Sequence, residues 1–494
     1  MTSRRTVLAA SAAAAAGGGG GGGVLVAAPA AEAAPAASLV SADPIAHLLR
    51  RATYGPTPQS LAEAKKLGVA GWLDRQLNPS RIDDAVCDRL LARLPLAGAS
   101  VARVRAALPV HSYAAFGQLG RAAVARAVWS NRQLFETTAM FWANHLHIAA
   151  PSSGVWDSRC DYEAQVIRRH AFGKFSEMLT ASAKHPAMLT YLDNRSSTKA
   201  HPNENYAREL MELHTVGLLY TENDVAAAAR LLTGMTVGRD GGYVYQASAR
   251  AAGTVRILGY TGADPDAFFD YLAHHPATAK RIATKLCVRF VADDAPASLV
   301  ARLAQIYLDN DTAIVPVLRA LFTSPEFAAS AGQKMRTPLE DLAASIRALG
   351  LGPESSGVKA LDALYNELAD AGNAPYRWSP PNGFPDVAAA WASPSAFLMK
   401  CNLHLNLAAG WYPSQLTRPA DLLRSLVPVR PATFGALVDA LAVRLTGTRL
   451  PAAHTAAALS VAGKLPTSPV DKSLDGAAPY LIAMVLNSPT FQLR

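Results

Sequence analysis

The feature that most constrains the fold of this chain is the spacing of its apolar residues, which follow a helical period from Asp43 onward. Asp43-Pro44 and Thr57-Pro58 are typical helix starts, because a capping side chain followed by proline suits the first turn. Proline and glycine clusters separate the periodic segments, as connections between helices require. The pattern predicts long helices over residues 111–130, 132–148, 157–172, 203–219, 222–235, 276–290, 297–309 and 334–349.

Two segments depart from the helical pattern. Residues 241–245 and 254–258 alternate at period two, which favours a small hairpin or flap near 243–258. Residues 376–386 combine prolines and glycines with aromatic side chains, so we expect a packed loop there, followed by a helix from Trp391 to Trp411. The sequence therefore predicts an all-α, multihelical fold in one large domain over 43–494, built as one body or as two lobes meeting near the flap.

The first 37 residues have the composition of a processing segment. Arg4 and Arg5 are the paired arginines of a twin-arginine export signal, and the glycine run at 17–23 keeps the next stretch less hydrophobic than a membrane span. Ala-x-Ala sequences follow at 31–33 and 34–36. We predict a signal peptide over 1–37 and a linker over 38–42. The protein is then periplasmic, cell-envelope or extracellular, and the export machinery is one partner.

Charge and hydropathy exclude two function classes. Removing Arg4, Arg5 and Glu32 from 47 basic and 38 acidic residues leaves 45 against 37, a net charge of +8. The basic residues are scattered, so we expect no nucleic-acid partner. No run of 18 apolar residues follows the signal, so we expect no transmembrane span in the mature chain. The four cysteines lie far apart without a CxxC pair and are expected to be buried thiols.

The segment most informative about chemistry is a polar helix that starts at an N-cap, Asn203, and ends near Gly217. At about 100° per residue, Asn205, Glu209 and Glu212 share one stripe of this helix, flanked by Arg208. Carboxylates at i and i+3 can converge on one point, which suits paired acids or two metal ligands. His214 belongs to the opposite, apolar face. The alternative is a solvated charged face held by Glu204–Arg208 and Arg208–Glu212 ion pairs.

A second polar segment covers residues 136–147. His145 is expected to lie above Phe141 and Trp142, which would make it a tunable acid, base or ligand. His147 points about 200° away, so the two histidines cannot chelate one ion from a regular helix. The alternative for His145 is a packing histidine near a helix end.

These segments predict a polar centre without naming a reaction. Its catalytic candidates are Glu209, Glu212, His145, Arg208 and Arg168, and its binding candidates are Asn144, Asn203, Glu204 and Asn205. Arg168 is expected either to reach a carboxylate of the acidic stripe or to lie in an exposed basic patch. A metal ion is one candidate cofactor. No nucleophile elbow, Walker loop, dinucleotide fingerprint, HExxH or CxxCH sequence is present.

Several sequence blocks resemble the family catalogued as domain of unknown function 1800. They are Phe141-Trp142-Ala143-Asn144-His145, Asp161-Tyr162-Glu163 with Ile167-Arg168, residues 202–210, Tyr220-Thr221-Glu222 to Thr233-Gly234, residues 275–279 and residues 381–386. The blocks run in order over nearly the whole mature chain, and the helix with Asn203 to Leu210 is the most specific. Phe384 stands where the family's loop is expected to carry tryptophan.

The resemblance implies a large bacterial protein, often exported, with no established activity. It also implies a neighbouring gene for an exported, sulfatase-like protein, which is a candidate partner. Two functions follow as alternatives. The chain is either an envelope or extracellular enzyme with a carboxylate, histidine and arginine centre, or a non-catalytic binding or scaffold protein that acts with the sulfatase-like partner.

Overall fold

Helix starts in this protein follow the capping side chains that the sequence predicts. In the computed structural model, which describes residues 39–494, the carboxylate of Asp43 accepts hydrogen bonds from the backbone N–H groups of Ile45 and Ala46. Thr57 and Ser60 form a reciprocal capping box at the next helix. The predicted signal peptide, with Arg4 and Arg5, lies outside the described residues.

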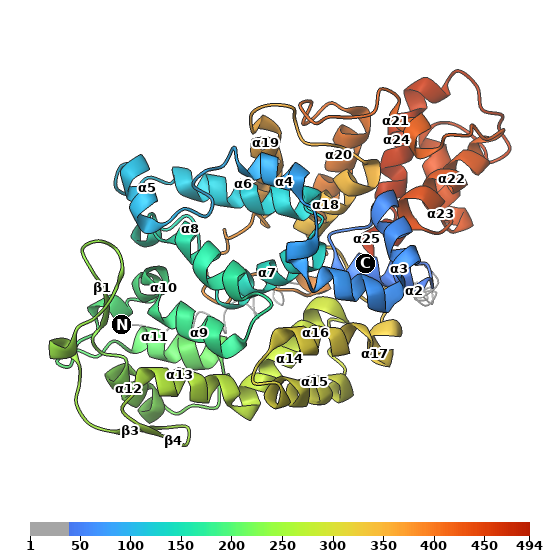
Figure 1. The fold of residues 1–494 in the computed structure, drawn as a ribbon. Coiled ribbons are helices and arrows are strands. Elements are labelled where there is room, and N and C mark those ends of the chain that lie inside the picture. The colour runs from blue at the N-terminus through green and yellow to red at the C-terminus, as the bar shows by residue number, and fades with distance from the viewer. Residues whose placement is uncertain (1–38) are drawn as a thin grey trace, which may run out of the picture. The chain divides into compact units, whose positions relative to one another are not determined.

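The described chain is built from helices along its whole length (Figure 1). The first group is α2 (Pro44–Ala52), α3 (Pro58–Gln76), α4 (Ala85–Leu91), α5 (Val101–Ala107), α6 (Ala114–Trp129), α7 (Gln133–His145), α8 (Arg159–Tyr162), α9 (Phe175–Lys184), α10 (Pro186–Tyr191), α11 (Glu204–Glu209) and α12 (Glu222–Leu231). The second group is α13 (Pro265–His274), α14 (Pro276–Phe290), α15 (Ala297–Asp309), α16 (Ile314–Phe322), α17 (Pro325–Ala328), α18 (Pro338–Leu349), α19 (Lys359–Asp370), α20 (Pro394–Ala409), α21 (Leu422–Leu426), α22 (Phe434–Thr446), α23 (Ala452–Val461), α24 (Leu474–Leu486) and α25 (Pro489–Gln492). These helices confirm the all-α prediction.

Two of the predicted helices change their winding part of the way along. Residues 163–168 (η4) and 210–214 (η6) form π-helices, which follow directly on α8 and α11. A π-turn closes an i→i+5 hydrogen bond, so it holds more residues than an α-turn. Side-chain directions that are calculated with 100° per residue therefore differ from the real ones after Leu210, where the π-segment begins.

The strands form two small hairpins, and their pairing differs from the prediction. β1 (Met235–Val237) pairs with β2 (Tyr243–Tyr245), and β3 (Val255–Ile257) pairs with β4 (Tyr260–Gly262), both antiparallel. The predicted partners, 241–245 and 254–258, thus belong to different sheets. The reason lies in the second turn, where Leu258 and Gly259 both have positive φ, as a two-residue turn requires. That short turn joins β3 to β4.

Two hydrophobic clusters make up the interior. The first gathers buried residues of α2, α7, α9 and α12–α16, and the second those of α6, α18–α20 and α22–α24. Met140 of α7 packs against both clusters. Within residues 39–494, no helix combines the length and apolar character needed to cross a membrane.

Candidate active site

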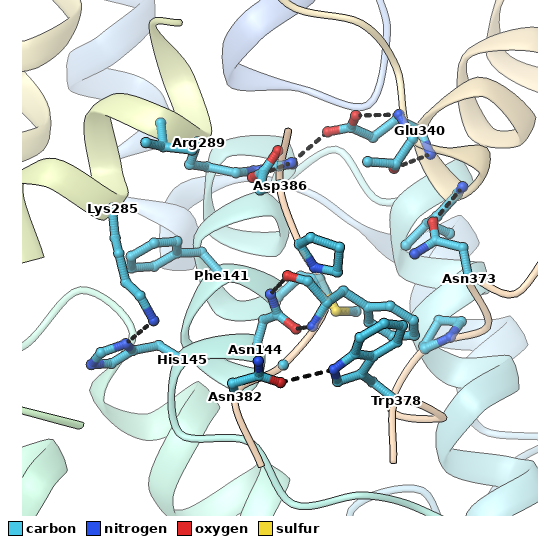
Figure 2. A pocket seen from close by; sticks show the side chains of 18 of the residues that line it. Phe141, Asn144, His145, Lys285, Arg289, Glu340, Asn373, Trp378, Asn382 and Asp386 are labelled. Atoms are coloured by element: carbon cyan, nitrogen blue, oxygen red, sulfur yellow. Dashed lines mark hydrogen bonds and ion pairs between the residues drawn. The ribbon is translucent and has the colours of Figure 1, made fainter. Parts of the chain in front are cut away.

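The end of helix α7 and the middle of helix α14 face each other across a cavity of about 350 Å³. Asn144 and His145 come from the last turn of α7, while Lys285 and Arg289 lie one turn apart on α14. Residues 373–386 contribute a third wall. Figure 2 shows Lys285 pointing across to His145, with the loop passing beside Asn144. The pocket lies where residues of both hydrophobic clusters meet.

His145 is held in one protonation state by its two neighbours. Its Nε2 lies 3.0 Å from the backbone carbonyl oxygen of His214, and because a carbonyl only accepts, Nε2 carries the proton. Its Nδ1 lies 2.9 Å from the Lys285 amine, which must donate to it. Burial, helped by the charges of Lys285 and Arg281, holds the pKa of His145 well below its usual range. The ring is therefore a neutral acceptor at pH 7.

Lys285 is an amine without an acidic partner. Its only hydrogen bond among the described residues goes to His145, and no carboxylate of residues 39–494 forms an ion pair with it. Burial lowers the pKa of Lys285 to about 7, and the neighbouring charge of Arg281 lowers it further in the same direction. A substantial fraction of this amine is consequently unprotonated at neutral pH, unlike an ordinary lysine.

The surroundings of this pair are short of negative charge. His214 is 1% exposed, and neither of its ring nitrogens has a hydrogen-bond partner within the described chain. Burial and the charges of Lys285 and Arg281 lower the pKa of His214 to about 3. Burial also lowers the pKa of Arg281, an effect that the charge of Glu212 opposes. Such a cluster suits a ligand with an electron-rich group, such as a carbonyl or carboxylate oxygen.

The far side of the cavity is a closed ion-pair network. Glu340, in the first turn of α18, pairs with Arg289 at 2.5 Å and with Arg494 at 3.0 Å. Asp386 joins both arginines at 3.3 and 3.4 Å. Burial alone would raise the pKa of Glu340, but the two guanidinium groups hold it at about 2. Because these charges neutralise one another, this wall is better suited to fixing the pocket than to reacting.

The Asn144 side chain fastens the loop beside the pocket through two hydrogen bonds. The Asn144 amide donates to the carbonyl oxygen of Phe384 at 2.7 Å and accepts from the Phe384 N–H at 2.6 Å. Gly383 packs so closely that a Cβ atom there would lie 2.1 Å from the backbone oxygen of Asn144, and its φ is +73°. Asn382 accepts a hydrogen bond from the Trp378 indole at 3.0 Å. The predicted packed loop thus forms a wall of the site.

The polar helix contributes to the edge of this site in two places. Glu212 accepts a hydrogen bond from the hydroxyl of Tyr220 and lies within electrostatic range of Arg281. Glu209 lies within electrostatic range of Tyr191, whose hydroxyl donates to the carbonyl of Ser379 in the pocket loop. The two carboxylates of the predicted stripe thus do not line the pocket themselves; each interacts with another residue near it.

The remaining residues of the polar helix have structural contacts. Asn203 caps α11 by accepting from the Asn205 N–H, and the Asn205 amide donates to the carbonyl of Leu192. Arg208 pairs with Glu204 at 3.4 Å, as the solvated-face alternative requires, but its second carboxylate is Glu222 at 2.7 Å. The predicted Arg208–Glu212 pair is replaced by this contact.

Arg168 reaches inward, but to a carboxylate outside the acidic stripe. Its two terminal nitrogens donate to Glu136 of α7 at 2.7 and 2.8 Å. Burial favours the neutral acid, yet Arg168 lowers the pKa of Glu136 overall. This bidentate pair joins Arg168 of η4 to Glu136 of α7 and so holds the two helices together. The exposed basic patch, the other alternative for Arg168, does not form.

Metal binding has no obvious centre in the described part of the chain. Helix α7 ends at His145, so His147 lies beyond it, and its Nε2 bonds to the carbonyl of Trp378 at 2.7 Å. Across residues 39–494, no three His, Cys, Asp or Glu side chains are grouped to hold an ion. The four cysteines are free thiols, three of them buried.

Sequence reasoning missed Lys285, Arg289 and Glu340. On α14 the basic residues 281, 285 and 289 recur every four positions, which ordinarily marks a solvated face. Only the approach of α7 and α18, elements distant in sequence, turns that face into a pocket wall. The aromatic loop at 376–386 gave a weak indication of the pocket, because the aromatic side chains of a packed loop must lie against another part of the protein.

The chain belongs to a family of proteins of unknown function, DUF1800, whose model matches residues 47–493. The match confirms the family that the sequence blocks resemble. No curated protein and no solved structure is significantly similar to the chain. The function therefore has to be argued from the pocket itself.

Proposed function

We propose that this protein is an exported enzyme whose reacting group is the amine of Lys285, and that it acts on a carbonyl compound bound in the pocket. The observation that carries the proposal is the contact between the Lys285 amine and the acceptor nitrogen of His145, on the wall of a 350 Å³ cavity. An unprotonated lysine in an apolar, positively charged setting is a nucleophile toward carbonyl carbon.

His145 would orient this amine and move its proton. Because the His145 Nδ1 accepts one amine hydrogen, the amine lone pair is directed away from the ring. When that lone pair attacks a carbonyl carbon, the nitrogen gains positive charge and the carbonyl oxygen becomes an alkoxide. The nitrogen passes one proton to Nδ1, and the imidazolium delivers it to the alkoxide, which gives a carbinolamine. The second proton of the nitrogen follows the same route to the hydroxyl group, which leaves as water while the carbon–nitrogen double bond forms. The step consumes one carbonyl and one amine and releases one water.

The acidic helix has a supporting role in this proposal. The charge of Glu212 raises the pKa of Arg281, and the charge of Arg281 lowers the pKa of Lys285 and so helps to keep its amine unprotonated. Glu209 acts on the pocket loop through Tyr191. The two glutamates are thus proposed as positioning residues, while His145 and Lys285 touch the substrate. Asn144 would shape the pocket by holding Phe384.

The proposed place of action is outside the cytoplasm, by the twin-arginine route. Arg4 and Arg5 and the weakly hydrophobic stretch after them support this location. A sulfatase-like exported partner, implied by the family resemblance, remains part of the proposal.

A second candidate function is binding without reaction. It is favoured by two aromatic side chains that line the pocket, Trp378 and Phe384, whose ring centroids lie 5.2 Å apart. Both are partly exposed, and partly exposed aromatic groups with polar neighbours suit the capture of a surface polymer or a partner protein.

Reductive trapping with glyoxylate and cyanoborohydride at pH 7 separates the two functions. We expect Lys285 to be alkylated about tenfold or more faster than Lys280, an exposed lysine on the same helix, because far more of its amine is unprotonated. Peptide mass spectrometry locates the adduct. His145→Phe should slow the labelling of Lys285 and leave that of Lys280 unchanged. Equal rates at the two lysines would reject the enzyme and favour the binding function.

A further inference from the structure

A second cavity, of about 440 Å³, lies away from the Lys285 pocket and has a different chemical character. Helices α2 and α3 form one side of it, and α18, the end of α22 and α25 form the other. Figure 1 shows α2 and α3 beside α25. The cavity therefore joins the first described helices to the last ones.

Most of the lining of this cavity is aliphatic or aromatic. The apolar residues are Ala46, Pro56, Pro58, Leu61, Ala62, Ala344, Ala348, Val443, Leu445 and Phe491. A volume of this size is within the range of small-ligand sites. An apolar molecule, or the apolar part of one, would be well desolvated there.

The charged groups of the lining are all positive. They are Arg50, Lys65, Arg336 and Arg444, and no aspartate or glutamate from residues 39–494 lines the cavity. Asp43 approaches Lys65 at 3.7 Å from outside the lining. The acids nearest to Arg336 have other partners, since Asp341 bonds to His404 at 3.0 Å and Glu340 to Arg289. The four cations are thus not balanced by acidic groups within the cavity.

Two buried donors in this cavity have no partner among the described residues. Arg336 is 4% exposed, and its Nη1 makes no hydrogen bond. Thr490 is 1% exposed, and its hydroxyl is likewise unpaired. Buried polar groups are ordinarily satisfied, so two unpaired donors on one cavity indicate an acceptor that is supplied from elsewhere.

The position of Arg336 is fixed by packing. Its Cζ lies 4.4 Å from the centroid of the Phe491 ring, a stacking contact that orients the guanidinium plane. Burial lowers the pKa of Arg336 to about 10, which still leaves it charged at neutral pH. A rigid, charged donor of this kind binds carboxylate or phosphate oxygens well.

We propose that this cavity binds an aliphatic anion, in which the acidic head group meets Arg336 and Thr490 and the chain fills the apolar lining. A free fatty acid and an alkyl phosphate share this chemistry. Inorganic anions lack the chain, and fatty alcohols lack the charge. The site is independent of the reaction proposed for Lys285.

Isothermal titration calorimetry on the full chain tests the proposal with decanoate, decyl phosphate, decanol and inorganic phosphate. We expect the two amphiphilic anions to bind at least about tenfold more tightly than decanol or inorganic phosphate, because hydrogen bonds to charged groups are worth about that factor or more. The ratio of decanoate to decyl phosphate affinity identifies the preferred head group. Decanol binding as tightly as decanoate, or inorganic phosphate binding as tightly as decyl phosphate, would overturn the proposal.

Two variants locate the binding. Arg336→Gln should weaken decanoate binding about tenfold, and Thr490→Val should weaken it several-fold, while both leave decanol binding nearly unchanged. Arg302→Gln is the matched control. Arg302, on α15, is exposed and pairs with Glu326 of α17. Undiminished decanoate binding in both folded variants would contradict the assignment. If Arg336→Gln does not fold, Thr490→Val and the comparison of ligands on the unaltered protein still decide the question.

Discussion

An amine that is partly buried without an acidic partner costs folding free energy, because its charged form loses hydration and gains no ion pair. Lys285 is such a group. Its side chain is half-buried, and the one hydrogen bond that it makes within residues 39–494 goes to a histidine that is itself kept neutral. Arg289, one turn away, shows the usual solution, since it is neutralised by Glu340 and Asp386. The contrast between these neighbours on α14 is the main reason to regard Lys285 as functional.

The ion pairs of Glu340 give the first prediction at the scale of single residues. Glu340→Gln should lower the free energy of unfolding by about 3–5 kcal/mol at pH 7, because it leaves Arg289 and Arg494 without their shared carboxylate. Denaturant unfolding measures the change. Glu326→Gln, which breaks the more exposed pair with Arg302, should cost less than about 1 kcal/mol. Equal losses would show that the buried network is not what stabilises this wall.

The same carboxyl group predicts how stability depends on pH. The pKa of Glu340 is about 2 in the folded protein and near the ordinary 4.5 when unfolded. The ionised Glu340 therefore contributes its full stabilisation of the folded state above about pH 4.5, and this stabilisation is lost as the pH falls toward 2. The difference in stability between the unaltered protein and Glu340→Gln should shrink over this window. A difference that stays constant down to pH 2 would contradict the assigned pKa.

At the scale of elements, the pocket depends on the joint between α7 and the loop at 378–386. Asn144→Asp should loosen this loop, because a carboxylate cannot donate to the carbonyl of Phe384. We expect faster hydrogen exchange in residues 378–386, corresponding to a loss of about 1–3 kcal/mol of local stability. Asn382→Asp is the control on the same loop, since it keeps the oxygen that accepts from Trp378. Unchanged exchange in Asn144→Asp would show that other contacts hold the loop.

Local signals in the sequence predicted where helices and strands occur better than they predicted the type of helix or the partner of each strand. The starts at Asp43 and Thr57, and the full extent of the helix at 276–290, follow from caps and periodicity. The π-turns at 163–168 and 210–214 carry no such signal, because neither capping residues nor apolar periodicity distinguishes an i→i+5 turn from an α-turn.

The candidate site was predictable only in part, for the same physical reason. His145 and Asn144 carried a local signal, in an aromatic and polar helix end, and both line the pocket. Lys285 lies 140 positions away from His145, and nothing in its own helix marks it. The acidic stripe was conspicuous, yet Glu209 and Glu212 are not among the residues that line the pocket, and they interact electrostatically with Tyr191 and Arg281, respectively.

At the scale of the whole molecule, the Lys285 pocket lies where the two hydrophobic clusters meet, a common location for ligand sites.

Export is the prediction that belongs to this scale. Arg4→Lys combined with Arg5→Lys should leave the precursor in the cytoplasm, because the paired arginines are what the export receptor reads. Cell fractionation followed by immunoblotting measures this. Normal export of the double variant would reject the twin-arginine route.

The measurement that tests the central claim most directly is the titration of the Lys285 amine in the folded protein. The lysines are reductively methylated with ¹³C-formaldehyde, and the resonance of residue 285 is assigned from its loss in Lys285→Arg. We predict that its chemical shift titrates with a pKa of about 7, well below the value near 10.4 of a lysine side chain in a model peptide. A pKa near that ordinary value for Lys285 would mean that the amine is protonated under physiological conditions, and would contradict the proposed chemistry.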